Sequence, residues 1–207
     1  MYRRLLFISA VITLCSTLNA QSVYFKEGQR GLTATLSRSN PDFAFDKLFT
    51  TSLGYTLRGR IDIGIIYSNF TENRQTAGGS GGVNGYWLNR AEFNIITPTI
   101  NYLIVKSKGG TNIGAGLGYN LVLGSVGVND FVFNMNLSQR IGKIDKINLL
   151  PHYSLSFSGS NTASSLGASL VLPGKRYFVV TPSMVSGEGD SYFNLDLAYS
   201  LWVRDKK

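Results

Sequence analysis

Residues 192–203, with the sequence YFNLDLAYSLWV, decide the fold because apolar and polar side chains alternate along the stretch. Phe193 and Leu195 fall on one face together with the later apolar residues, whereas Asn194 and Asp196 fall on the other. A period of two residues is typical of a β-strand, since successive side chains of a strand point to opposite faces. The stretch is therefore predicted to be a strand with one apolar face and one small, polar face.

The same alternation recurs along the chain after Gly31, between clusters of Gly, Asn, Ser, Asp and Lys. Ten strands are predicted, at 31–38, 48–57, 60–70, 91–105, 112–123, 131–141, 147–157, 165–172, 176–185 and 191–203. Eight strands are the alternative, because Pro98, Pro151 and Pro182 interrupt three of these runs. Proline lacks an N–H group, so each is expected at a β-bulge or a loosened pairing, with a bulge at Ile95-Ile96.

The connections between the runs are of two kinds that alternate along the chain. One set is tight and basic, at 58–59, 106–110, 142–146 and 173–175. The other set is longer and richer in Gly, Ser, Asn and acids, at 39–46, 71–89, 124–130, 158–164 and 186–190. We refer to the two ends as the turn end and the loop end. This arrangement predicts an all-β protein, a closed antiparallel transmembrane β-barrel over residues 31–203.

A soluble β-barrel or sandwich is the competing fold. Its polar strand faces would meet water and would normally carry Lys, Glu and Arg. In this sequence the second face consists mainly of Gly, Ser, Thr and Asn, and the charges lie at the strand ends. Small uncharged side chains suit the crowded interior of a narrow closed barrel, so the apolar face is expected to point outward into lipid.

The first twenty residues have the layout of a cleaved secretory signal, in which a basic start precedes an apolar stretch. Cleavage is expected after the small residue Ala20, so that Gln21 begins the mature chain. Residues 21–30 would then form a periplasmic segment, and residues 204–207 a basic C-terminal tail. Cys15 is the only cysteine and lies within the signal, which leaves the mature chain without a thiol for a disulfide, a metal site or a nucleophile.

The run GLGYNL at 116–121 and the aromatic final strand at 192–202 resemble the small outer-membrane β-barrel superfamily of Gram-negative bacteria. The resemblance covers the mature chain loosely and rests on no sharp motif. It implies a location in the cell outer membrane. Many members end on an aromatic residue used for assembly, whereas this chain continues from Val203 to Lys207.

Positive charge gathers at the turn end of the predicted barrel. The chain has a formal net charge of +8. The cations at this end are Arg58, Arg60, Lys106, Lys108, Arg140, Lys143, Lys146, Lys175, Arg176, Arg204, Lys206 and Lys207. A ring of basic turns suits anionic head groups of outer-membrane lipid, the expected partner. Nucleic acid is not expected, because the turns offer no aromatic stacking platform. A small ligand at the loop end and the oligomeric state are left open.

The only histidine, His152, is followed two residues later by Ser154, which puts both side chains on one strand face. The triplet resembles the His-x-Ser of the outer-membrane lipid A deacylase family, which implies a base and a nucleophile. The next residues, 155–157, read LSF where that family usually has Asn-Ala. The predicted register also points both side chains into the lumen, away from lipid. Both are therefore expected to be non-catalytic lumen residues, and no cofactor or metal site is predicted.

Sorting the inward-facing positions by depth predicts a lumen with a polar middle and an apolar layer at each end. The turn-end layer comprises Leu103, Leu150, Val171, Tyr177, Val179 and Trp202. The loop-end layer comprises Leu48, Ile66, Val122, Val132 and Tyr192. Apolar constrictions oppose the passage of ions. The leading hypothesis is a non-catalytic outer-membrane barrel that is structural, ligand-contacting or a narrow pore. The alternatives are a lipid A-modifying barrel enzyme and a soluble periplasmic β-barrel binding protein.

Overall fold

The computed structural model describes residues 21–40, 45–78, 85–123, 129–143, 146–159, 161–174, 176–187 and 190–204. These residues form η1 (Gln21–Val23), β1 (Arg30–Asn40), β2 (Phe45–Leu57), β3 (Ile61–Gly78), β4 (Gly85–Lys106), β5 (Thr111–Leu123), β6 (Asp130–Gln139), β7 (Asn148–Ser158), β8 (Asn161–Leu172), β9 (Phe178–Gly187) and β10 (Asp190–Arg204). No helix among them is long and apolar enough to cross a membrane.

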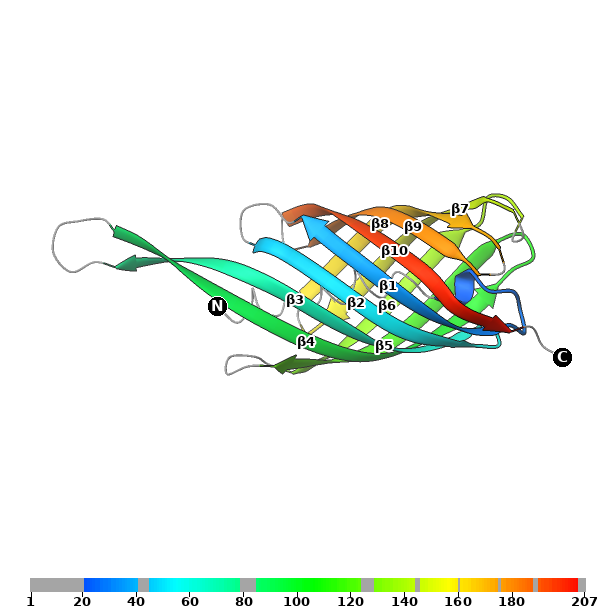
Figure 1. The fold of residues 1–207 in the computed structure, drawn as a ribbon, viewed down its shortest axis with the longest axis horizontal. Coiled ribbons are helices and arrows are strands. Elements are labelled where there is room, and N and C mark those ends of the chain that lie inside the picture. The colour runs from blue at the N-terminus through cyan, green and yellow to red at the C-terminus, as the bar shows by residue number, and fades with distance from the viewer. Residues whose placement is uncertain are drawn as a thin grey trace.

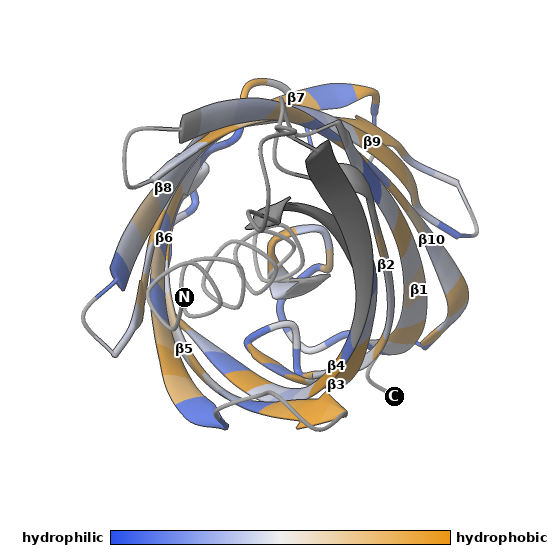
Figure 2. Cartoon of the chain, turned by 90° about the vertical axis from the view of Figure 1, so that its left-hand side faces the viewer, coloured by the Kyte–Doolittle hydropathy of each residue, from blue (hydrophilic) through white to orange (hydrophobic). Residues whose placement is uncertain are grey.

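The ten strands form one closed antiparallel barrel (Figure 1). Each strand pairs with its neighbours in sequence, and β1 closes the ring against β10. The view from the loop end shows the strands arranged in a ring (Figure 2). The predicted closed barrel of ten strands is therefore confirmed, and the alternative of eight strands is wrong.

The three strand prolines coincide with interruptions of the pairing on one side of their strands. Pro98 pairs with Ile65 of β3 but lies in a gap of the β4–β5 pairing. Pro151 lies just past the end of the β6–β7 pairing, and Pro182 lies in a gap of the β8–β9 pairing. The register is the same on both sides of the two gaps. The prolines thus mark loosened pairings, and the bulge predicted at Ile95-Ile96 is wrong.

Two register shifts occur at the turn end instead, and each changes where the following side chains point. The β4–β5 register shifts between Leu103 and Val105, so Lys106 returns to the lumen side. The β1–β10 register also shifts, and Leu201 becomes the unpaired residue. Trp202 consequently faces outward with 43% of its surface exposed. Its predicted place in the turn-end lumen layer is wrong, because a bulge reverses the alternation beyond it.

The apolar strand face points outward and the polar face points inward, the reverse of the arrangement in a soluble protein. On β10, Leu197 is 41% exposed whereas the neighbouring Asp196 is fully buried. Every strand carries exposed large apolar side chains, for example Leu36, Leu53, Ile65, Ile100, Leu117, Phe133, Tyr153, Leu166, Met184 and Leu197. A continuous apolar belt of this extent is not stable against water, so its surroundings are lipid. The chain is a transmembrane barrel, and the soluble-barrel alternative is wrong.

The strands continue further at the loop end than the sequence pattern predicts. Residues 71–89 were expected to form a loop, but β3 and β4 stay paired from the barrel out to Gly78 and Gly85. The resulting hairpin projects beyond the other strands (Figure 1). The expected loop at 158–164 is likewise replaced in part by strand, since Ser158 of β7 pairs with Asn161 of β8. Alternation of apolar and polar residues is lost where both faces of a hairpin leave the membrane, so the pattern does not show these extensions.

Gly116 of β5 lies beneath the side chain of Asn101. A Cβ atom at Gly116 would come within 1.8 Å of Asn101 Oδ1 and 2.8 Å of Asn134 Nδ2, so both amides would have to move. We expect Gly116→Ala to lower the free energy of unfolding by about 1–3 kcal/mol, measured by urea titration in lipid vesicles. Gly109→Ala is the control, because its Cβ would meet only Ser107 Oγ, at 3.6 Å. Equal stability of the two variants would contradict this prediction.

Candidate functional site

Residues 21–29, called the plug below, lie at the turn end of the barrel, where η1 is visible as the short blue helix in Figure 1. Val23, Tyr24 and Phe25 of the plug are buried, and Phe25 is completely so. They pack in one cluster with Leu103, Leu150, Val171, Tyr177, Val179 and Ala198 of the barrel wall. The plug and the wall together close the turn end with apolar side chains.

Aromatic packing centres this cluster on Phe25. The Phe25 and Tyr177 rings meet edge to face, with their centroids 5.5 Å apart. The Phe25 ring also lies against Gly31 at the start of β1, where a Cβ atom would come within 2.5 Å of it. A residue with a side chain at position 31 would therefore displace Phe25 from the mouth of the barrel.

Lys106 holds the plug through main-chain oxygens. Its Nζ donates hydrogen bonds to the carbonyl oxygens of Ser22 at 2.7 Å, Phe25 at 2.5 Å and Gly59 at 2.8 Å. These three bonds use all three protons of the ammonium group. The register shift near the end of β4 is what turns Lys106 inward, so the bulge serves the plug directly.

A second cation and a carboxylate also hold the plug. Arg140 donates from Nη2 to the carbonyl oxygen of Val23 and from Nη1 to Asn148 Oδ1 at 3.1 Å. Burial lowers the pKa of the Arg140 guanidinium, which nevertheless stays charged at neutral pH. Asp62 Oδ2 accepts a hydrogen bond from the Ser22 N–H at 2.9 Å. Its other oxygen accepts from Thr56 Oγ1 at 2.6 Å.

Tyr24 supplies a test of how firmly the plug is buried. Its hydroxyl lies 3.3 Å from Ser169 Oγ, and burial raises the pKa of Tyr24 from 10.0 to about 12. The folded state favours the neutral phenol of Tyr24. The resulting stabilisation is complete below pH 10 and is lost as the pH rises from about 10 to about 12. We expect phenolate absorbance to show one tyrosine ionising near pH 12 that is missing in Tyr24→Phe. A difference between the two proteins centred at pH 10 would contradict this prediction.

The middle of the lumen is lined by small polar side chains, as predicted. Buried members include Asn134, Asn136, Ser154, Ser165, Ser169, Thr181, Ser183, Asn194 and Asp196. Some of them bond to one another, as Asn194 Nδ2 does to Asp196 Oδ1 at 2.8 Å. Others, such as the Ser154 and Ser183 hydroxyls, have no protein partner among the described residues. Such groups need water to satisfy them, which indicates a hydrated interior.

His152 and Ser154 both face the lumen, where the predicted register places them. Their exposed fractions are 8% and 3%. His152 Nδ1 lies 3.3 Å from the Leu150 carbonyl oxygen, and no hydrogen bond joins Nε2 to any described residue. The two side chains lie behind the barrel wall from the surrounding lipid. The resemblance to a deacylase would instead require both side chains to face an acyl chain in the membrane.

The loop end carries the second apolar layer. Ile66, Val132 and Tyr192 are buried there, as predicted, and Val122 is half-buried. The side chain of Leu48, also predicted in this layer, lies outside the described ones. Ile95 and Val185 belong to the layer as well and are 2% and 0% exposed. The predicted apolar layers are thus confirmed at both ends for the members whose side chains are described, apart from Trp202.

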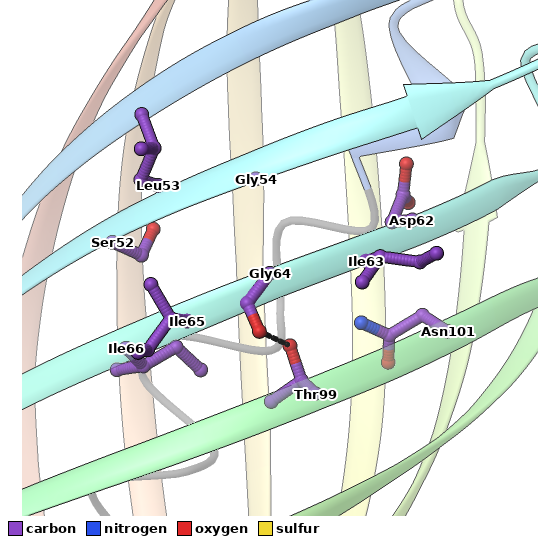
Figure 3. Close-up of a pocket in the computed structure, with 10 residues that line it drawn as sticks. All are labelled: Ser52, Leu53, Gly54, Asp62, Ile63, Gly64, Ile65, Ile66, Thr99 and Asn101. Carbon is purple, nitrogen blue, oxygen red and sulfur yellow. Dashed lines mark hydrogen bonds between the residues drawn. The ribbon is translucent and has the colours of Figure 1, made fainter.

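A small space opens on the lumen side of β2, β3 and β4 (Figure 3). The lumen-facing residues around it are Ser52, Gly54, Asp62, Gly64, Ile66, Thr99 and Asn101. Gly54 and Gly64 pair across the two strands and leave the room, and Thr99 Oγ1 donates to the Gly64 carbonyl oxygen at 3.5 Å. No group of three or more His, Cys, Asp or Glu side chains gathers here or elsewhere in the described part of the chain.

The plug is the functional element that sequence reasoning missed. Residues 21–30 were expected to be a periplasmic segment, whereas Ser22 to Phe25 are buried inside the barrel. The available signal is the apolar triplet Val23-Tyr24-Phe25, which would be unusual in a segment exposed to water. Its destination could not be predicted, because the bulge that brings Lys106 inward leaves no clear mark in the sequence.

No protein-family model and no curated protein matches the sequence. Among solved structures, the chain is similar to the translocator domain of the autotransporter NalP from Neisseria meningitidis, at 11% identity and a TM-score of 0.48, covering 96% of this chain and 93% of that one. It is similar to the β domain of the Bordetella autotransporter BrkA, at 9% identity and a TM-score of 0.46, covering 84% and 99%. It is also similar to Ail of Yersinia pestis, at 13% identity and a TM-score of 0.29, covering 86% and 100%. Likeness at this level does not extend to substrates or partners.

Proposed function

We propose that this protein is a non-catalytic barrel of the Gram-negative outer membrane that acts as a sealed structural or surface-contacting protein. The observation that carries the proposal is the plug, because residues of the chain itself close the turn end of a lumen whose middle is polar. The loop-end layer around Tyr192 narrows the other end. A general diffusion pore would need a continuous wet path.

The location is tested by fractionation of cells that express the full chain. A signal at residues 1–20 directs export, and a wholly β-stranded barrel with an apolar belt suits the outer membrane. We expect the protein in the outer-membrane fraction, released only by detergent, with Gln21 as its first residue. Recovery in the soluble periplasmic extract or in the inner membrane would overturn the location.

Sealing is tested by reconstitution of the purified protein in planar bilayers. The unmodified barrel should show no large, persistently open conductance, since Tyr24 and Phe25 occupy its turn end. A steady, porin-like current from the unmodified protein would overturn the proposal.

Lipid A deacylation is measured on the same preparation, with His152→Ala as the control. Hydrolysis that disappears in this variant would establish the enzymatic alternative.

Lipid head groups are the partner proposed for the turn end. Exposed cations there comprise Arg30, Arg58, Lys108, Lys143, Lys146, Arg176 and Arg204. Several adjoin the apolar belt, as Arg176 does, with its guanidinium carbon 5.9 Å from the centre of the Tyr199 ring. None of these seven cations forms an ion pair within the described part of the chain, so they are available to lipid phosphates.

A further inference from the structure

Asp62 is a buried carboxylate that lacks a cationic side chain in contact. It is 4% exposed and lies inside the barrel on β3. No Lys or Arg of the described residues forms an ion pair with it. Lys106 is the nearby candidate, but its three protons are all donated to carbonyl oxygens of Ser22, Phe25 and Gly59. Lys106 attracts the Asp62 carboxylate through space only, and a cation in direct contact would stabilise this buried charge further. A positive charge in contact with Asp62 is therefore still missing.

The position of the plug shows where the missing positive charge can come from. Asp62 Oδ2 already accepts the N–H of Ser22 at 2.9 Å. The nitrogen of Gln21 precedes that of Ser22 by one residue, a step of at most about 3.6 Å. It therefore lies within about 6–7 Å of the carboxylate, close enough to bind after a small rotation. In the uncleaved precursor this nitrogen belongs to a neutral amide, whereas cleavage after Ala20 makes it an ammonium group.

We propose that Asp62 is the binding site for the α-ammonium group of Gln21, so that signal cleavage itself completes the plug. The inference rests on the proposed export and cleavage. Thr56 orients the carboxylate by donating to Oδ1 at 2.6 Å, which leaves Oδ2 directed at the plug. Closure of the barrel is thereby linked to processing, because the last electrostatic contact of the plug exists only in the mature chain.

The test labels the α-amine of mature protein purified from outer membranes in detergent. N-terminal sequencing first establishes Gln21 as residue one. An amine-reactive reagent is then applied at neutral pH, and labelling of the N-terminal peptide is followed by mass spectrometry. Only the deprotonated amine reacts with the reagent. An ion pair that raises the pKa of the amine by about one therefore slows labelling about tenfold. We expect labelling to be about tenfold slower in the unmodified protein than in Asp62→Asn.

Two further variants keep the test decisive. Asp130→Asn removes a carboxylate at the loop end, where Asp130 accepts from Asn120 Nδ2 at 3.0 Å, and should leave labelling slow. Insertion of Gly-Ser between Ala20 and Gln21 moves the amine two residues away without changing any barrel residue. It should raise the labelling rate even if Asp62→Asn fails to fold. Heat-dependent mobility on gels verifies the folded barrel in each case.

The outcomes separate this inference from the proposed function. Protein absent from the outer membrane would contradict the location, and a first residue other than Gln21 would contradict the cleavage site. With Gln21 first, equal labelling of the unmodified protein and Asp62→Asn overturns the inference alone. A Gln21 that has cyclised with loss of ammonia has no ammonium group and overturns it as well. Slow labelling of the Gly-Ser variant would do the same, because protection would then not depend on Asp62.

Discussion

Replacing Tyr24 and Phe25 together by alanine is expected to give a barrel that conducts ions persistently in planar bilayers. Phe25 is fully buried and Tyr24 is 2% exposed, so the two rings fill the turn end. Removing both leaves the lumen open toward its polar middle, where Asn134 and Asp196 line the wall. Conductance is read as single-channel current, and the unmodified protein should remain silent under the same voltage.

Glu27→Ala is the matched control for this pair. Glu27 belongs to the same plug, but it is exposed and forms its ion pair with Arg60 outside the apolar cluster. An exposed pair of this kind contributes little to stability, so its loss should leave the barrel closed. A silent Tyr24→Ala/Phe25→Ala barrel would show that the loop-end layer alone blocks the lumen, and that the plug is not the barrier.

Leu197→Arg is expected to lower the free energy of unfolding by about 2–4 kcal/mol, the cost of a cation at the middle of a lipid-facing strand. Leu197 lies at the centre of β10 and faces outward, 41% exposed. Leu36 of β1 and Val180 of β9 pair with Leu197 on the two adjacent strands. An arginine there must reach along the apolar belt to find water. Reversible urea unfolding from lipid vesicles measures the change.

Ile147→Arg is the control on the same face at another depth. Ile147 is 66% exposed and lies beside Lys146 at the turn end, where the belt meets the head groups. The same substitution there should cost only about 0–1 kcal/mol, because the guanidinium reaches water and phosphate at once. Equal losses in the two variants would mean that depth does not matter, and that the outward face is not surrounded by lipid.

The alternation of apolar and polar residues correctly predicts which side chains face the interior of the barrel wherever the strands are regular. Their spacing placed His152 and Ser154 on one strand face and the predicted register pointed that face into the lumen, where the structure buries both side chains. Val171 and Tyr177 were assigned to the turn-end layer by the same alternation and belong to its apolar cluster. His152, Ser154 and Val171 lie in regular stretches of strand, and Tyr177 directly precedes β9. In a regular strand a period of two fixes the side on which every side chain lies once one is known.

Trp202 and Lys106 show where the pattern stops. Each follows an unpaired residue, Leu201 in β10 and Ile104 in β4, that reverses inside and outside. Leu201 and Ile104 are ordinary apolar residues, so their local sequence does not distinguish a bulge from a regular strand. Both bulges arise from the pairing with neighbouring strands, which is a property of the closed barrel.

The amino-acid sequence by itself determined the ten-stranded barrel, its apolar outer face and its layered polar lumen, because these depend on alternation between neighbouring residues. The tertiary structure alone decided that the plug enters the barrel. Phe25 packs against Tyr177, which is 152 residues later in the sequence. The hydrogen bond from Lys106 to the Ser22 carbonyl oxygen joins residues that are 84 positions apart. Contacts between segments so distant form only in the folded barrel, and no local pattern encodes them.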